Sequence, residues 1–95
     1  MKLVWTSQAV EDRRAIYDYI DAENPRAAAE LDEQFMLAAD RLRAHPEIGR
    51  PGRVSGTREL VAHQRYFLLY EIVDDTVYVL AVVHTSRQWP PVSAS

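Results

Sequence analysis

Two stretches in the second half of the chain are apolar at almost every position. They run from Tyr66 to Val73 and from Val77 to Val83, and the intervening Asp74-Asp75-Thr76 indicates a hairpin turn. A strand with one face in water alternates apolar and polar residues, whereas a strand covered on both faces does not. We therefore expect one face of this hairpin to pack on the chain's own helices. The other face, which so short a chain leaves unshielded, is expected to meet a second polypeptide.

The segment that follows residue 23 carries the clearest helix signal. Asn24-Pro25 is an N-cap followed by proline at the first helical position, and Pro46 predicts that the helix ends near Ala44. The apolar residues in between recur with a period of 3.6: Ala28, Leu31, Phe35, Ala38, Ala39 and Leu42.

A first helix is expected over about residues 8–22, with Ser7 as its N-cap. Its inner stripe contains Ala9, Ile16 and Ile20, and Arg13 interrupts that stripe. Only Glu23-Asn24 separates the two helices, which predicts an antiparallel helical hairpin.

The remaining segments complete an α+β pattern. Residues 1–6 and 57–63 are predicted strands, and residues 64–65 are a tight link to the apolar hairpin. Residues 46–56 contain two prolines and all three glycines, so a loop is expected there. The order β-α-α-β-β-β predicts a single domain, residues 1–95, with the helical hairpin packed on one face of a small, mainly antiparallel sheet.

The charge of the chain is unevenly distributed. The net charge is −3, with 6 basic and 10 acidic side chains in residues 1–47 but 5 basic and 4 acidic in residues 48–95. Four of these arginines lie close together: Arg50, Arg53, Arg58 and Arg65. Proteins that work on nucleic acid usually have a basic domain, so this balance argues against a polyanion as the main ligand.

The composition also excludes several kinds of site. There is no cysteine, and the three histidines are far apart in the sequence, so we expect no disulfide, no metal and no cofactor. No apolar run approaches the ~18 residues of a membrane span, and the first residues lack the pattern of a signal peptide. The expected location is the cytoplasm, away from membranes.

Short segments spread over most of the chain carry a family resemblance. They are Val4-Trp5-Thr6, Ala9, Asp12, Ile16, Tyr19-Ile20, Asn24-Pro25-Arg26-Ala27-Ala28, His45-Pro46, Gly49-Arg50-Pro51-Gly52-Arg53, Gly56-Thr57-Arg58-Glu59-Leu60, Tyr66, Tyr70, Val82-Val83-His84 and Arg87. In order and spacing they resemble the RelE/ParE superfamily of bacterial type II toxin–antitoxin toxins. Residues 49–56 and the run at 58–60 are more similar to the ParE-like branch, which implies a role in plasmid stabilization.

The resemblance implies a toxin that is neutralised by a ParD-like or RelB-like antitoxin encoded beside it, in a hetero-oligomer. Such complexes usually bind operator DNA, and we expect the toxin to reach DNA only in this way. ParE-like members inhibit DNA gyrase by protein binding, whereas RelE-like members are ribosome-dependent endoribonucleases that cut mRNA. The acidic balance favours gyrase and a protein without catalysis of its own. The nuclease stays the alternative, and a plain interaction domain is the third possibility.

Each candidate residue has a functional and a structural interpretation. If the nuclease hypothesis holds, the catalytic residues are Arg58, which the resemblance implies for the phosphate, His84 as a general acid, and Arg87. Arg58 could equally form a salt bridge, and His84 could simply close the sheet by hydrogen bonding. Glu59 or His63 could supply the base. The residues expected to bind the antitoxin or target are Arg50, Arg53, Arg58, Phe67, Leu69, Tyr78, Leu80 and Trp89.

Overall fold

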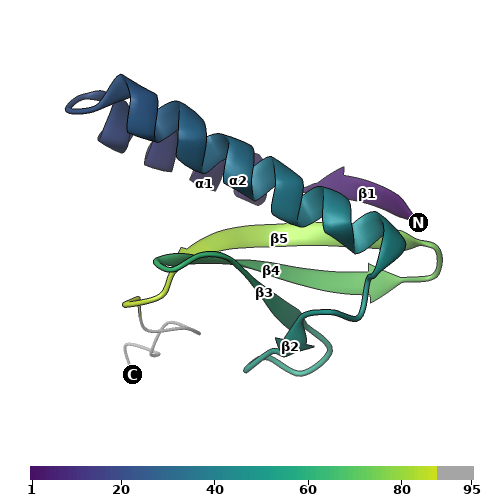
Figure 1. Cartoon of the computed structure of the whole chain (residues 1–95). Helices are drawn as coiled ribbons and strands as arrows, with labels where there is room; N and C mark the ends of the chain where they lie inside the picture. Colours follow the sequence, from purple (N-terminus) through teal and green to yellow (C-terminus); the bar gives the residue numbers. More distant parts are fainter. Residues whose placement is uncertain (88–95) are drawn as a thin grey trace.

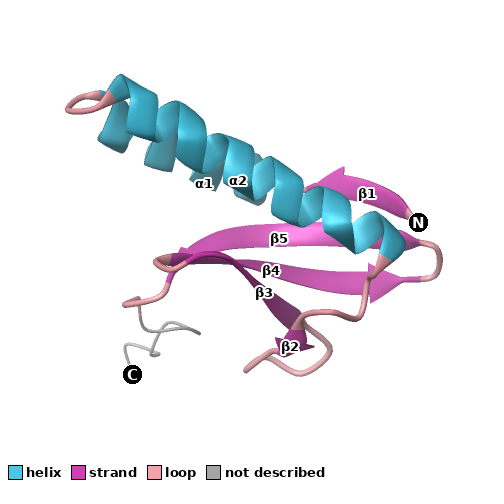
Figure 2. Cartoon of the chain, in the orientation of Figure 1, coloured by secondary structure: helices cyan, strands magenta, loops and turns pink. Residues whose placement is uncertain are grey.

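The computed structural model describes residues 1–87. Within them, two helices lie over one face of a five-stranded sheet, and the opposite face carries no helix (Figure 1). Figure 2 shows the same two layers coloured by secondary structure. The predicted α+β fold is confirmed. No helix within residues 1–87 combines the length and apolar character needed to cross a membrane.

Both helices begin at side-chain caps. Helix α1 (Ser7–Asp21) is capped by Thr6, whose Oγ1 accepts a hydrogen bond from the backbone N–H of Ala9 at 3.3 Å, so the prediction of Ser7 as the cap is wrong by one residue. Helix α2 (Pro25–Ala44) begins after Asn24, as predicted, with the Asn24 side chain accepting from the N–H of Ala27 at 3.1 Å.

The sheet has the strand order β1-β5-β4-β3-β2. The strands are β1 (Lys2–Trp5), β2 (Arg50–Pro51), β3 (Arg58–His63), β4 (Tyr66–Val73) and β5 (Thr76–His84). Strand β1 pairs with β5 in parallel, and the other three pairings are antiparallel. The short β2 lies inside the segment predicted to be a loop, because Arg50 and Pro51 pair with the first residues of β3.

The main core lies between the helices and the sheet. Its buried side chains come from α2, from α1 and from alternate positions of three strands: Ala9, Leu31, Phe35, Ala38, Ala39, Leu42, Leu60, Leu68, Tyr70, Val77, Val79 and Val82. Arg13, which interrupts the predicted stripe of α1, lies beside this core rather than in it. Its guanidinium is 4.5 Å from the centroid of the Trp5 ring and donates two hydrogen bonds to Asp32 of α2.

A β-bulge in β5 changes which side chains face the helices. The pairing of β4 with β5 shifts between Leu69 and Tyr70, which leaves Leu80 as an extra residue in β5. Side chains normally alternate between faces. Because of the extra residue, Val79 and Val82 both belong to the helix-side core although three positions separate them.

The face away from the helices carries a second buried cluster. It consists of Phe67, Leu69, Ala81 and Val83, each between 1% and 8% exposed, with Leu80 packed against it. The sequence led us to expect an unshielded face here, and that expectation is wrong. The arginine of β2 covers part of it: the Arg50 guanidinium lies 5.9 Å from the centroid of the Phe67 ring.

Candidate partner-binding site

A groove of about 520 Å³ lies beside the cluster on the helix-free face. Its apolar lining residues, here called its floor, are Val54, Leu69, Leu80, Ala81 and Val83, and its polar lining residues are Gln8, Asp12, Thr57 and Arg87. These residues come from α1, from the loop between β2 and β3, from β4 and β5, and from the segment after β5. The groove can therefore receive a chain segment that carries both apolar and charged side chains.

The groove follows an edge of β5 that β1 does not cover. The pairing of β1 with β5 stops at Trp5 opposite Val79, so no strand within residues 1–87 pairs with the second half of β5 on this side. Side chains at the start of α1 occupy part of the edge. Thr6 Oγ1 donates to the carbonyl of Val79 at 2.9 Å, and Asp12 Oδ2 accepts from the backbone N–H of Val82 at 3.0 Å.

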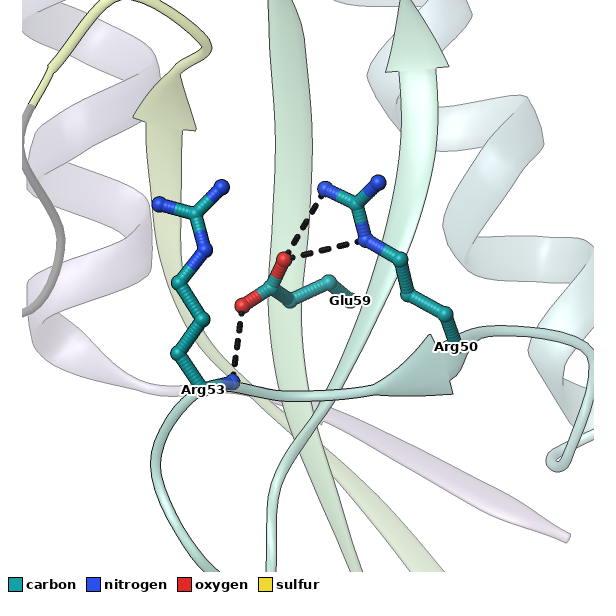
Figure 3. Close-up of polar contacts among 3 residues, drawn as sticks. All are labelled: Arg50, Arg53 and Glu59. Atoms are coloured by element: carbon teal, nitrogen blue, oxygen red, sulfur yellow. Dashed lines mark hydrogen bonds and ion pairs between the residues drawn. The ribbon is translucent and has the colours of Figure 1, made fainter.

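A buried carboxylate holds the basic loop against the sheet. Glu59 is 2% exposed, and its Oε1 accepts from Nε and Nη2 of Arg50 at 3.1 and 3.0 Å. Its Oε2 accepts from the backbone N–H of Arg53 at 3.2 Å. Figure 3 shows the Glu59 carboxylate between the two arginine side chains, which extend across the helix-free face. Glu59 thus positions positive charge beside the apolar cluster.

Arg58 has a different environment. Its Nη1 donates to the carbonyl oxygens of Gly49 at 2.8 Å and Glu47 at 3.2 Å. These bonds fasten the segment after α2 to the start of β3. The guanidinium of Arg58 therefore donates to backbone carbonyls of its own chain. This favours the structural interpretation of Arg58.

His84 and Arg87 lie together at the other end of the sheet. They line a cleft of about 240 Å³ with Asp12, Tyr66 and residues of α1. His84 Nδ1 lies 3.0 Å from the backbone N of Ser86 and 2.6 Å from its Oγ. Burial raises the pKa of Tyr66 above 10.0, and nearby Tyr19 raises it further against the opposing effect of Arg65, so this phenol is neutral at neutral pH.

The residues proposed for catalysis are therefore not all brought together. Arg58 pairs with Tyr70 in the sheet, whereas His84 pairs with Tyr66. The four positions between these two tyrosines along β4 correspond to about 13 Å. His84 and Arg87 share a cleft, but Arg58 lies toward the opposite end of the strands.

Residues 3–89 of the chain match a family model. The family is described as the ParE toxin of the type II toxin–antitoxin system parDE. The chain belongs to the ParE toxin family. The resemblance seen in the sequence is confirmed, and this ParE-family protein is a toxin of the RelE/ParE superfamily.

Two sequence relatives span nearly the whole of this ParE-family toxin. Y4kP of Sinorhizobium fredii (strain NBRC 101917 / NGR234) is 40% identical over 92 residues, which cover 96% of this chain and 95% of the relative. Toxin RelE2 of Caulobacter vibrioides (strain ATCC 19089 / CIP 103742 / CB 15) is 36% identical over 86 residues, covering 90% of this chain and 97% of the relative.

Solved structures share the fold. A chain of the chromosomal ParDE TA system from P. aeruginosa superposes with a TM-score of 0.80 at 25% identity, covering 88% of this chain and 95% of that chain. The YoeB/ParE toxin from Agrobacterium tumefaciens superposes with a TM-score of 0.63 at 17% identity, covering 88% of this chain and 98% of that chain.

The predicted binding residues of this ParE-family toxin differ in accessibility. Arg50 and Arg53 are exposed and Leu80 is half-buried at the groove, whereas Phe67 and Leu69 are 1% and 3% exposed. Phe67 and Leu69 can lie beneath a bound segment, but they can contact it broadly only if the side chains that cover them move. Tyr78 is half-buried on β5, and Trp89 lies outside the described residues. Their roles in binding stay predictions.

Sequence reasoning missed several residues of the groove. Asp12 and Thr57 entered only among the segments that carry the family resemblance, Thr57 also as the first residue of a predicted strand, and Val54 only as part of a predicted loop. Ala81 and Val83 reach the groove because of the bulge at Leu80. The resemblance indicated that Asp12 and Thr57 belong to the family pattern, but it did not indicate that they lie beside the same groove.

Proposed function

We propose that this toxin inhibits bacterial DNA gyrase by binding it as a protein, without chemistry of its own. The observation that carries the proposal is the separation of Arg58 from His84 and Arg87, together with the engagement of Arg58 by two backbone carbonyls. Cleavage of RNA without metal needs a base, an acid and phosphate-binding cations around one phosphate. A protein inhibitor needs only a surface, and it is compatible with a net charge of −3.

We propose further that a cognate antitoxin, encoded beside the toxin, neutralises it by occupying the groove on the helix-free face. The apolar floor would take aliphatic side chains of an extended segment, and the uncovered edge of β5 offers backbone hydrogen bonds to it. Arg87 lines the groove, and Arg50 and Arg53 are exposed on the same helix-free face, so acidic residues are favoured in that segment. Such a hetero-oligomer would be the form that contacts operator DNA.

The endoribonuclease is the second candidate, and one observation favours it. His84, Arg87 and Tyr66 line the same cleft, so a histidine, a cation and a phenol are available at one place. The curated relative from Caulobacter also has a name from the RelE branch.

The target is tested by inducing the toxin in a bacterial cell. We expect plasmid supercoiling to be lost before translation fails, and purified toxin to inhibit gyrase in a supercoiling assay. His84→Ala and Arg87→Ala should leave this toxicity within about twofold of the unsubstituted chain, because neither residue performs chemistry. Early cleavage of mRNA with normal supercoiling, abolished by either substitution, would establish the nuclease instead. Arg58→Ala is a poor test, since it also releases the loop after α2.

The antitoxin site is tested with Leu80→Glu, which places a carboxylate on the floor of the groove. We expect at least about tenfold weaker binding of the antitoxin, measured by calorimetry on folded toxin. Val73→Glu is the matched control, because Val73 is 46% exposed at the far end of β4. Equal losses of affinity in both variants would show that the antitoxin binds elsewhere.

A further inference from the structure

The outer face of α2 carries an apolar ridge, Met36 and Leu37, that the rest of residues 1–87 leaves more than half exposed. Leu37 is 59% exposed and its neighbour Met36 is 54% exposed. The buried side chains of this helix lie on its other side, toward the sheet. Figure 1 shows α2 running across the outside of the molecule, in the helical layer. Met36 and Leu37 also line a cleft with Leu3 and Trp5 of β1, and a continuous exposed apolar surface of this kind indicates a contact site.

The charges along this ridge are arranged in a particular order. Glu33 precedes Leu37 by four residues and Arg41 follows it by four, so the three side chains share one face and each charge lies about 6 Å along the axis from the leucine. All three are exposed. Read along the helix, the ridge is acidic, apolar and then basic.

Neither charge is paired within residues 1–87. The ion pairs of α2 are Arg26 with Glu30, Asp40 with Arg43, and Asp32 with Arg13 of α1. Among the described residues, Glu33 and Arg41 form no ion pair. They therefore stand beside the exposed leucine as an acid and a base without an opposite charge.

We propose that this ridge joins two copies of the toxin in a two-fold dimer, with the two α2 helices packed antiparallel. A ridge that reads acid, apolar, base is complementary to itself when reversed. Leu37 of one copy then meets Leu37 of the other, and Glu33 meets Arg41 on both sides of the axis. Ridges formed by residues four apart commonly pack against each other in this way, and an isologous contact requires this self-complementarity.

The contact is small, so the dimer is expected to be concentration-dependent. The purified full-length chain is examined by sedimentation at concentrations from about 1 to 100 µM. We expect the mass to rise from 10.9 kDa toward twice that value. Leu37→Glu should raise the dissociation constant at least about tenfold, whereas Tyr19→Glu, at an 81% exposed position of α1, should not change it.

Charge reversal tests the pairing itself. Glu33→Arg and Arg41→Glu should each weaken the dimer, and the double variant should restore it, because the two residues are too far apart in one helix to compensate for each other. A chain that stays monomeric at every concentration would overturn the proposal. So would a double variant weaker than both single ones, or a Leu37→Glu variant that keeps its dimer and loses only antitoxin or gyrase binding. Since the proposal concerns the toxin alone, it can fail while the gyrase assignment stands.

Discussion

At the scale of single residues, Tyr70 connects the loop after α2 to the sheet from inside the core. Its ring is fully buried. Its hydroxyl donates to the carbonyl of Pro46 at 2.7 Å and accepts from the backbone N–H of Gly49 at 3.0 Å. A side chain placed on Gly49 would collide with this hydroxyl, at 2.6 Å, so the glycine is required by close packing.

The first prediction concerns this hydroxyl. Tyr70→Phe leaves a buried N–H and a partly buried carbonyl without their partner, so we expect a loss of about 1–3 kcal/mol in the free energy of unfolding. Urea denaturation at neutral pH measures it. Tyr17→Phe is the control, because Tyr17 is 36% exposed and should change stability little. Equal stabilities of the wild type and Tyr70→Phe would mean that the loop is held by other contacts.

The second prediction concerns alkaline pH. Burial raises the pKa of Tyr70 above 10.0, against the smaller lowering effects of the Gly49 hydrogen bond and of Arg58. The folded state therefore holds this proton more tightly than the unfolded state. The resulting stability is complete below about pH 10 and is lost as the pH rises through the raised value. Above about pH 10, the urea midpoint should fall less steeply with rising pH in Tyr70→Phe than in the unsubstituted protein. The urea midpoint of Tyr70→Phe will still depend on pH in this range, because the pKa of Tyr66 is raised as well.

The third prediction concerns Glu59. Glu59→Gln keeps the shape of the side chain but removes the charge that Arg50 contacts, so we expect about 1–2 kcal/mol of destabilisation. Glu30→Gln is the control, because its pair with Arg26 is solvent-exposed and should contribute under about 0.5 kcal/mol. Thermal unfolding of both variants distinguishes a structural anchor from an ordinary surface ion pair.

At the scale of elements, the uncovered half of β5 depends on α1. The carboxylate of Asp12 takes the backbone N–H of Val82, where a sixth strand would otherwise be needed. An exposed strand edge invites pairing with another chain. The start of the helix therefore both stabilises this edge and limits which segments can add to it.

The fourth prediction tests that edge. Asp12→Ala removes the acceptor, and we expect the amide of Val82 to exchange with solvent at least about tenfold faster. Hydrogen exchange followed by NMR measures this directly. Asp18→Ala, on the exposed side of the same helix, should leave the rate unchanged. Uniformly faster exchange throughout β5 would indicate general destabilisation instead.

Most elements could be predicted because their signals are local. Asn24-Pro25 marked the start of α2, and the apolar runs marked β4 and β5 within one residue of their bounds. The two-residue β2 left no such signal, since its pairing with β3 depends on the Glu59 carboxylate that holds the loop. The bulge at Leu80 was also invisible, because an extra residue in an apolar run does not change its pattern.

The candidate site was less predictable than the fold. The arginines around residues 50–58 were found, but the sequence could not separate Arg58, which binds carbonyls, from Arg50, which borders the apolar face. Burial of Phe67 and Leu69 depends on long-range packing across the sheet. Pattern alone predicts that a face is apolar, and it does not state what covers that face.

At the scale of the whole molecule, a 95-residue domain has a small core and a modest stability margin. The final prediction follows from this. An antitoxin segment that binds only the folded toxin adds about 2.7 kcal/mol at a free concentration of 100 times its dissociation constant. For a domain of this size that corresponds to a rise in Tm of about 10–20 °C. The rise should grow with antitoxin concentration, and it should be much smaller for Leu80→Glu at the same concentration. Calorimetry of the toxin and of Leu80→Glu with increasing antitoxin measures both effects. A Tm that does not change with antitoxin concentration would contradict binding at the groove.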